Sequence, residues 1–248
     1  MKFCIDAGHC SAGGDTGAQG NGLLEQDITW LVSDKLRSLL EAVGQSVVMT
    51  REYKDHILGK TEEESLNRRS RICNDAKCDW FISIHGNCVE NPAAHGTEVL
   101  VYAFGGQAEK LADTVQNEIV AKLGTYDRGV KEKNCSVLRK TNCPAILVET
   151  AFLSNEADSL LLRYRHDDFA EAIFKGICKH CGIKVQERYS YHKTVNQMLL
   201  DGVTSVENMQ YWEQNLDNGT KLMKNVCTII ERYQELLKER KKSEVTKL

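Results

Sequence analysis

The chain has 248 residues, of which 42% are hydrophobic, so it can bury a full core in one ordinary domain and a small second one. Its formal net charge is −3, with Lys and Arg interspersed among Asp and Glu, and this balance argues against a nucleic-acid partner. No apolar run approaches the roughly 20 residues of a membrane span, and the N-terminus lacks the regions of a secretory signal, so we expect synthesis in the cytoplasm.

Short apolar runs alternate with amphipathic stretches along most of the chain. Lys2–Ile5 predicts a strand, and a loop rich in Gly, Ser and Asp follows it through Gly22. Apolar side chains between Ile28 and Val43 then repeat at helical spacing. Further along, the sequence predicts strands at 47–49, 80–84 and 97–103, helices at 61–76 and 107–123, a short strand at Ser136–Arg139, an apolar strand at 145–148 and closing helices up to Gly182.

This alternation predicts an α/β fold with a mixed central sheet flanked by helices, over residues 1–183. The composition changes after Gly182, and we expect a separate small three-helix domain at residues 190–242. The ten cysteines are scattered through expected helices and strands, which indicates buried free thiols rather than a disulfide framework. Cys178 and Cys181 form a C-x-x-C pair, but they lack a second ligand pair, so we do not favour a metal or redox role.

Three polar side chains stand at strand ends of the expected sheet. Ligands of open α/β sheets collect beyond the carboxyl ends of the strands. His9 follows the first strand after a Gly-containing turn, His85 ends the strand at 80–84, and Glu149 ends the strand at 145–148. We therefore expect these three groups at one edge of the sheet.

Glu25 lies three residues before Ile28, on the inward stripe of its helix. Burying an unpaired charge is costly, so this carboxylate should form a salt bridge, cap the helix or bind a metal. Two imidazoles and one carboxylate with an open fourth position match the hydrolytic zinc pattern, which makes His9, Glu25 and His85 candidate ligands. For each histidine alone, structural hydrogen bonding is the alternative interpretation.

Asn87 and Arg139 are further candidates near this edge, where they could hold substrate carbonyls or carboxylates. Structural hydrogen bonding is the favoured role for each. The remaining histidines have no convergent partners and are interpreted as non-ligands: His56, His95, His166, His180 and His192.

An ordered set of motifs extends from residue 2 to about 182. These are DAGH, DTGAQGNGLLEQD, the Thr50-Arg51 pair, RSRICNDAKCDWFISIHGN, HGTEVLVY and CPAILVETAFLSNEAD. Together they resemble the zinc N-acetylmuramoyl-L-alanine amidases of the amidase 3 family. The chain departs from the family pattern at Thr150-Ala151, where a Gly is usual, and at Cys73, where Ala is common.

The resemblance implies the family's phosphorylase/hydrolase-like α/β fold and one Zn²⁺ ion. It assigns the zinc ligands to His9, Glu25 and His85 and the catalytic glutamate to Glu149. The implied reaction is cleavage of bacterial peptidoglycan at the amide between N-acetylmuramic acid and L-alanine. A zinc carboxypeptidase acting on wall peptides and a non-catalytic wall-binding protein are the alternatives.

The expected domain at 190–242 resembles small helical domains that trail bacterial and phage lysins. This resemblance implies wall targeting or self-association into a homo-oligomer. Because the sequence shows no export signal, a phage endolysin that reaches the wall at lysis fits best. A host enzyme released by lysis, or one whose leader is absent from this sequence, would look the same.

Overall fold

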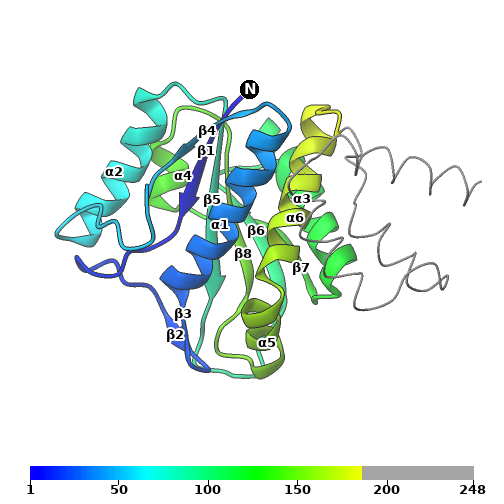
Figure 1. The fold of residues 1–248 in the computed structure, drawn as a ribbon. Helices are drawn as coiled ribbons and strands as arrows, with labels where there is room; N and C mark the ends of the chain where they lie inside the picture. The colour runs from blue at the N-terminus through cyan, green and yellow to red at the C-terminus, as the bar shows by residue number, and fades with distance from the viewer. Residues whose placement is uncertain (186–248) are drawn as a thin grey trace, which may run out of the picture. The chain divides into compact units, whose positions relative to one another are not determined.

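A computed structural model describes residues 1–185, coloured by position in Figure 1. Within this range no helix is long and apolar enough to cross a membrane. The elements in chain order are β1 (Lys2–Ala7), β2 (Gln19–Gly20), β3 (Leu23–Leu24), α1 (Glu25–Ala42), β4 (Ser46–Met49), α2 (Glu62–Asp75), β5 (Trp80–Asn87), β6 (Thr97–Val101), α3 (Gln107–Leu123), β7 (Asp127–Glu132), α4 (Ser136–Lys140), β8 (Ala145–Phe152), α5 (Glu156–Tyr164) and α6 (His166–Cys181).

The main sheet has six strands in the order β4-β1-β5-β8-β6-β7. Strands β4, β1, β5 and β8 are mutually parallel, whereas β6 runs antiparallel to β8 and parallel to β7. Helices α1, α3 and α6 pack together on one face, and α2 and α4 lie on the other (Figure 1). The mixed α/β sheet flanked by helices that the sequence predicts is therefore confirmed.

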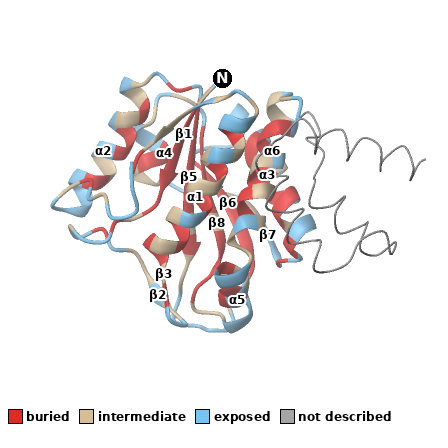
Figure 2. Ribbon diagram, viewed as in Figure 1, coloured by how far each residue is buried: buried red, intermediate tan, exposed pale blue. Residues whose placement is uncertain are grey.

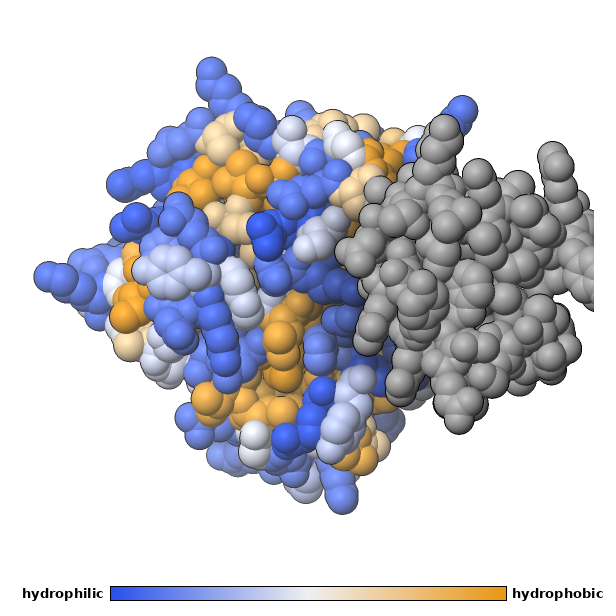
Figure 3. All heavy atoms as spheres, viewed as in Figure 1, coloured by the Kyte–Doolittle hydropathy of each residue, from blue (hydrophilic) through white to orange (hydrophobic). Residues whose placement is uncertain are grey.

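Two apolar clusters fill the space on either side of the sheet. Neighbouring residues of one strand point to opposite faces. Ile82 thus packs with Leu36 and Ile173 under α1 and α6, while Phe81 packs with Leu138 on the face of α2 and α4. Figure 2 shows this buried centre, and Figure 3 shows that hydrophilic side chains cover much of the outer face seen in the same view, with smaller hydrophobic areas between them. Because both faces are covered, the first halves of the central strands β5 and β8 are largely apolar.

Most of the expected elements are present, and the helix at 107–123 has the expected bounds. The expected strand at Ser136–Arg139 is wrong, because Ser136–Lys140 forms helix α4. A segment of five residues with only Val137 and Leu138 buried is too short to distinguish a strand period from a helix period. Strand β7 and the β2–β3 hairpin were not predicted. The expected domain at 190–242 lies outside the described residues.

Candidate metal centre

Three side chains from different elements meet at the carboxyl edge of the sheet. His9 follows β1, Glu25 begins α1, and His85 lies in β5; their ligand atoms are all within 4.8 Å of one another. Nε2 of His9 and Nδ1 of His85 each lie 3.1 Å from Oε1 of Glu25. The two imidazole rings are almost perpendicular, at 83°, with centroids 4.8 Å apart. The structure therefore brings together the three residues that the sequence singles out; their role as metal ligands stays a prediction.

Close packing of backbone against the rings explains two glycines of the N-terminal motifs. A Cβ atom on Gly8 would lie 2.5 Å from Cε1 of His85, and one on Gly17 would lie 2.7 Å from Cγ of His9. His9 itself has a φ of 62°, a left-handed conformation that costs about 1–2 kcal/mol for a residue with a Cβ atom. Local backbone strain of this kind clusters at functional sites.

The Glu25 carboxylate is buried and fully engaged. Oε2 accepts a hydrogen bond from the Ala18 amide at 2.9 Å, and Oε1 accepts one from the Gly86 amide at 3.1 Å. Burial opposes ionisation, but the hydrogen bonds to His85 and His9 outweigh it and hold the pKa of Glu25 well below its usual range. Helix capping was the alternative role that the sequence left open for Glu25. Because the carboxylate faces the histidines, these hydrogen bonds take the place of capping.

A buried carboxylate that sequence reasoning missed orients His9. Oδ1 of Asp15 lies 2.8 Å from Nδ1 of His9, so the other ring nitrogen, Nε2, faces Glu25. Oδ2 of Asp15 accepts hydrogen bonds from the hydroxyl of Ser65 and, at 3.1 Å, from the guanidinium of Arg69. Such carboxylate–histidine pairs fix the ring orientation and the tautomer of metal-binding histidines. Asp15 begins the DTG motif, six residues after His9. The sequence alone did not single it out, because a lone Asp in a loop has many structural roles other than orienting a histidine.

Charge in this network is balanced around Arg69, which is 1% exposed. Its guanidinium donates to Oδ1 of Asp6 at 2.7 Å as well as to Asp15. Burial opposes ionisation of Asp15, but its hydrogen bond with His9 and the charge of Arg69 lower its pKa to about 2. Burial disfavours charge on His9 too, yet the bonds to Asp15 and Glu25 raise its pKa to about 10. With these partners alone, His9 therefore favours its protonated form at neutral pH.

Glu149 is a different kind of carboxylate. It lies in β8, where it is the register partner of His85 in β5 and of Glu98 in β6. Its Oε2 atom is buried and has no hydrogen-bond partner. Burial raises the pKa of Glu149 above its ordinary value of 4.5. An unpartnered buried oxygen calls for an explanation in function or in bound solvent, and a proton acceptor for catalysis supplies one.

The remaining candidate residues, Asn87 and Arg139, differ in their surroundings. Nδ2 of Asn87 donates to Glu98 at 3.3 Å, which places Asn87 beside the strand partner of Glu149. Arg139 lies in α4 and donates to Asn134, so the structure gives it a local structural bond. Thr150, one of the departures from the family pattern, donates its hydroxyl to the backbone oxygen of His85 at 2.8 Å and so ties β8 to β5.

Comparison with known proteins shows which family the chain belongs to. Residues 3–179 match Amidase_3, described as N-acetylmuramoyl-L-alanine amidase. The chain belongs to this family. The predicted family, and with it a peptidoglycan hydrolase of the amidase class, is confirmed.

Relatives and solved structures agree with this assignment. The chain is 33% identical to the N-acetylmuramoyl-L-alanine amidase LytC of Bacillus subtilis over 69% of its own length and 34% of LytC. It is 32% identical to the endolysin of Bacillus phage SPP1 over 73% of its length and 66% of the endolysin. The CwlD amidase of Clostridioides difficile, solved with the GerS lipoprotein, superposes with a TM-score of 0.68 at 31% identity, covering 74% of this chain and 99% of CwlD. The chain thus spans about a third of LytC and about two thirds of the phage relative.

Proposed function

We propose that this amidase is zinc-dependent, with His9, Glu25 and His85 as the metal ligands and Glu149 as the catalytic base. The observation that carries the proposal is the pairing of a convergent His-Glu-His set with a neighbouring carboxylate whose Oε2 atom is buried and unpartnered. Two imidazoles and one carboxylate fit the donor set of hydrolytic zinc sites, which keep a fourth position open for water or substrate. The orienting bond from Asp15 to His9 adds the outer-shell support that such sites use.

Zinc, when bound, polarises the scissile carbonyl and lowers the pKa of a nearby water molecule. Glu149 accepts a proton from the attacking water at its carboxylate, because burial has raised its proton affinity. The water oxygen bonds to the carbonyl carbon of the lactyl group. Glu149 then donates the proton to the nitrogen of the leaving L-alanine, and the C–N bond breaks. The products are a free lactyl carboxylate and a free alanine amine.

The test combines metal content with product chemistry. We expect zinc at the predicted site and new alanine amino groups from purified peptidoglycan in the wild type. His85→Ala should lose that zinc and the activity together, whereas Glu149→Gln should keep the zinc and lose the activity. His56→Ala is the matched control, since His56 lies outside the cluster and stacks on Tyr53. Activity retained in Glu149→Gln would contradict the assigned base, and release of terminal amino acids would favour a carboxypeptidase.

We also propose that the protein reaches the cell wall when the cell lyses. The likeness to a phage endolysin supports this route. The predicted wall targeting or self-association by residues 190–242 concerns residues outside the described range and stays a prediction. Sedimentation of the full chain over a range of concentrations, with and without wall fragments, tests it. A chain that stays monomeric at every concentration and does not co-sediment with wall fragments would contradict both roles.

A further inference from the structure

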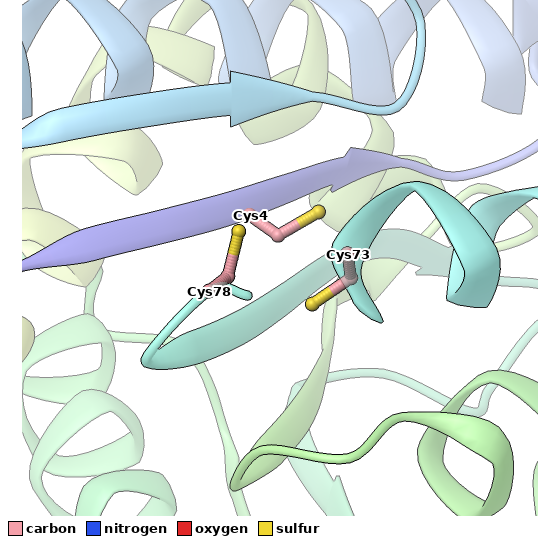
Figure 4. A group of neighbouring side chains, drawn as sticks. All are labelled: Cys4, Cys73 and Cys78. Carbon is pink, nitrogen blue, oxygen red and sulfur yellow. The ribbon is translucent and has the colours of Figure 1, made fainter. Parts of the chain in front are cut away.

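A second group of potential metal ligands lies away from the candidate metal centre. Figure 4 shows Cys4 on β1, Cys73 at the end of α2, and Cys78 in the turn that leads into β5. Their sulfur atoms all lie within 4.8 Å of one another. All three residues are buried, with exposed fractions of 0%, 1% and 8%. Three elements that are separate in the sequence therefore present thiols to one another inside the protein.

Cys143, just before β8, supplies a fourth thiol. Its Sγ atom lies 3.6 Å from Sγ of Cys73, far beyond the roughly 2.05 Å of a disulfide bond. With Zn–S bonds of about 2.3 Å, two sulfurs of a tetrahedral zinc site lie about 3.8 Å apart. The Cys73–Cys143 separation thus already matches such a site. The sulfurs of Cys4, Cys73 and Cys78, which lie within 4.8 Å of one another, need to approach by at most about 1 Å to reach the same spacing.

The surroundings suit a thiolate site as well. Four residues separate Cys73 from Cys78, within the two to four that are usual between paired cysteine ligands of structural zinc. Apolar side chains pack around the cluster, including Phe81 and Leu138, and supply no competing oxygen or nitrogen ligand. The ammonium group of Lys2 donates to the backbone oxygen of Ala76, between the two cysteines of the pair, at 2.8 Å. This positive charge lies where it offsets the negative charge of bound thiolates.

We propose that Cys4, Cys73, Cys78 and Cys143 bind a second zinc ion in a structural, four-sulfur site. Binding releases the four thiol protons to solvent and involves no change of oxidation state. Cys78 and Cys143 precede β5 and β8, whereas His85 and Glu149 lie toward the carboxyl ends of the same strands. The proposed ion therefore sits toward the opposite edge of the sheet from the catalytic residues. It would tie β1, the end of α2 and the start of β8 together.

Cobalt(II) in the reduced full-length protein separates the two sites, because only sulfur ligands give an intense sulfur-to-cobalt charge-transfer absorption. The candidate metal centre offers nitrogen and oxygen atoms alone. We expect this absorption in the wild type and in His85→Ala, which loses amidase activity if the proposed function holds. Cys73→Ser should abolish it, and Cys181→Ser should retain it as the matched control. With zinc, the wild type should hold two ions per chain, and Cys73→Ser and His85→Ala one each.

Cys143→Ser guards against a folding failure, because Cys143 is only partly buried and its loss leaves the inner three thiols packed. It should weaken cobalt binding and shift the absorption while the circular dichroism spectrum stays that of the wild type. The proposal is overturned if the reduced wild type shows no sulfur-to-cobalt absorption, or if Cys73→Ser and Cys143→Ser both leave it unchanged. Since activity is not the readout here, this result is independent of the fate of the proposed amidase mechanism.

Discussion

Gly17 offers the sharpest test of how the backbone shapes the metal centre. It has a φ of 70°, and a Cβ atom there would lie 2.7 Å from Cγ of His9 and 3.0 Å from Oε2 of Glu25. Carbon atoms in contact normally lie about 3.5–4.0 Å apart, so Gly17→Ala must displace the ring or its loop by about 1 Å. The loop cannot move alone, because the amide of Ala18 is bonded to Glu25. A displacement of that size costs roughly 100-fold in activity when it misplaces catalytic groups.

Gly44→Ala is the matched control. Gly44 has a φ of 76°, and a Cβ atom there would meet nothing within 4 Å. Both variants pay about 1–2 kcal/mol for the left-handed backbone, and each kcal/mol lowers the Tm by roughly 2–4 °C in a domain of this size. Thermal unfolding, zinc competition with a chelator and amino-group release should therefore separate them: both variants lose Tm through the backbone, Gly17→Ala loses more through its contact with His9, and zinc binding and activity are weakened in Gly17→Ala alone. Equal zinc affinity and activity in the two variants would refute the steric argument.

Three further predictions follow from individual contacts. Asp15→Asn should weaken zinc binding about 10–100-fold, measured against a chelator, because it removes the anionic partner that orients His9; unchanged affinity would contradict the orienting role. Glu149→Gln, measured after chelation of the metal, should unfold at a higher temperature than the wild type at neutral pH. The pKa of Glu149 is raised by burial, so its ionisation destabilises the folded state increasingly above pH 4.5, and the difference should vanish at lower pH. Gly176→Ala should cost about 1–3 kcal/mol of stability while activity per folded molecule is kept, because its Cβ atom would lie 2.7 Å from Cα of Val115 and push α6 from α3.

The long, strongly patterned elements could be predicted from the sequence. The helix at Gln107–Leu123 carries its buried residues at helical spacing, and the central strands β5 and β8 read as continuous apolar runs. Strand β7 could not be recognised in the same way, because Asp127–Glu132 is an edge strand that contains one apolar residue and a glycine. Helix α4 was wrongly predicted as a strand for a different reason: its two buried residues are compatible with the period of a strand and with that of a helix. What decides both segments is the neighbouring structure, which no local pattern contains.

The residues of the candidate site also fall into two groups, those that a local sequence pattern predicts and those that only the packed structure reveals. His9, His85 and Glu149 could be placed at one edge because each follows or ends a strand, and parallel strands bring their carboxyl ends together. Asp15 and Arg69 could not, since their importance lies in contacts across 54 residues of sequence. The four-sulfur cluster was equally invisible, because Cys4, Cys73 and Cys143 meet only when β1, α2 and β8 are packed. The position of a residue in the sequence predicts whether it reaches the carboxyl edge of the sheet. Its burial and its hydrogen-bond partners, which only the structure shows, indicate which role it can have there.

The two acidic residues of the centre show how burial and pairing assign roles. Glu25 and Glu149 are the same amino acid and both neighbour His85; Glu25 is buried, and Glu149 is half-buried with its Oε2 atom out of contact with water. Four hydrogen bonds hold Glu25 in its charged form, which its proposed role as a metal ligand requires, whereas Glu149 has no partner at Oε2 and is shifted toward its neutral form. Carboxylates whose pKa values are pushed in opposite directions are the signature of distinct acid–base assignments within one site. The partner that Glu149 lacks is therefore the feature that suits it to the proposed role of accepting a proton from water and passing it on, and we expect a permanent hydrogen-bond donor at that position to remove the proton affinity that this role requires.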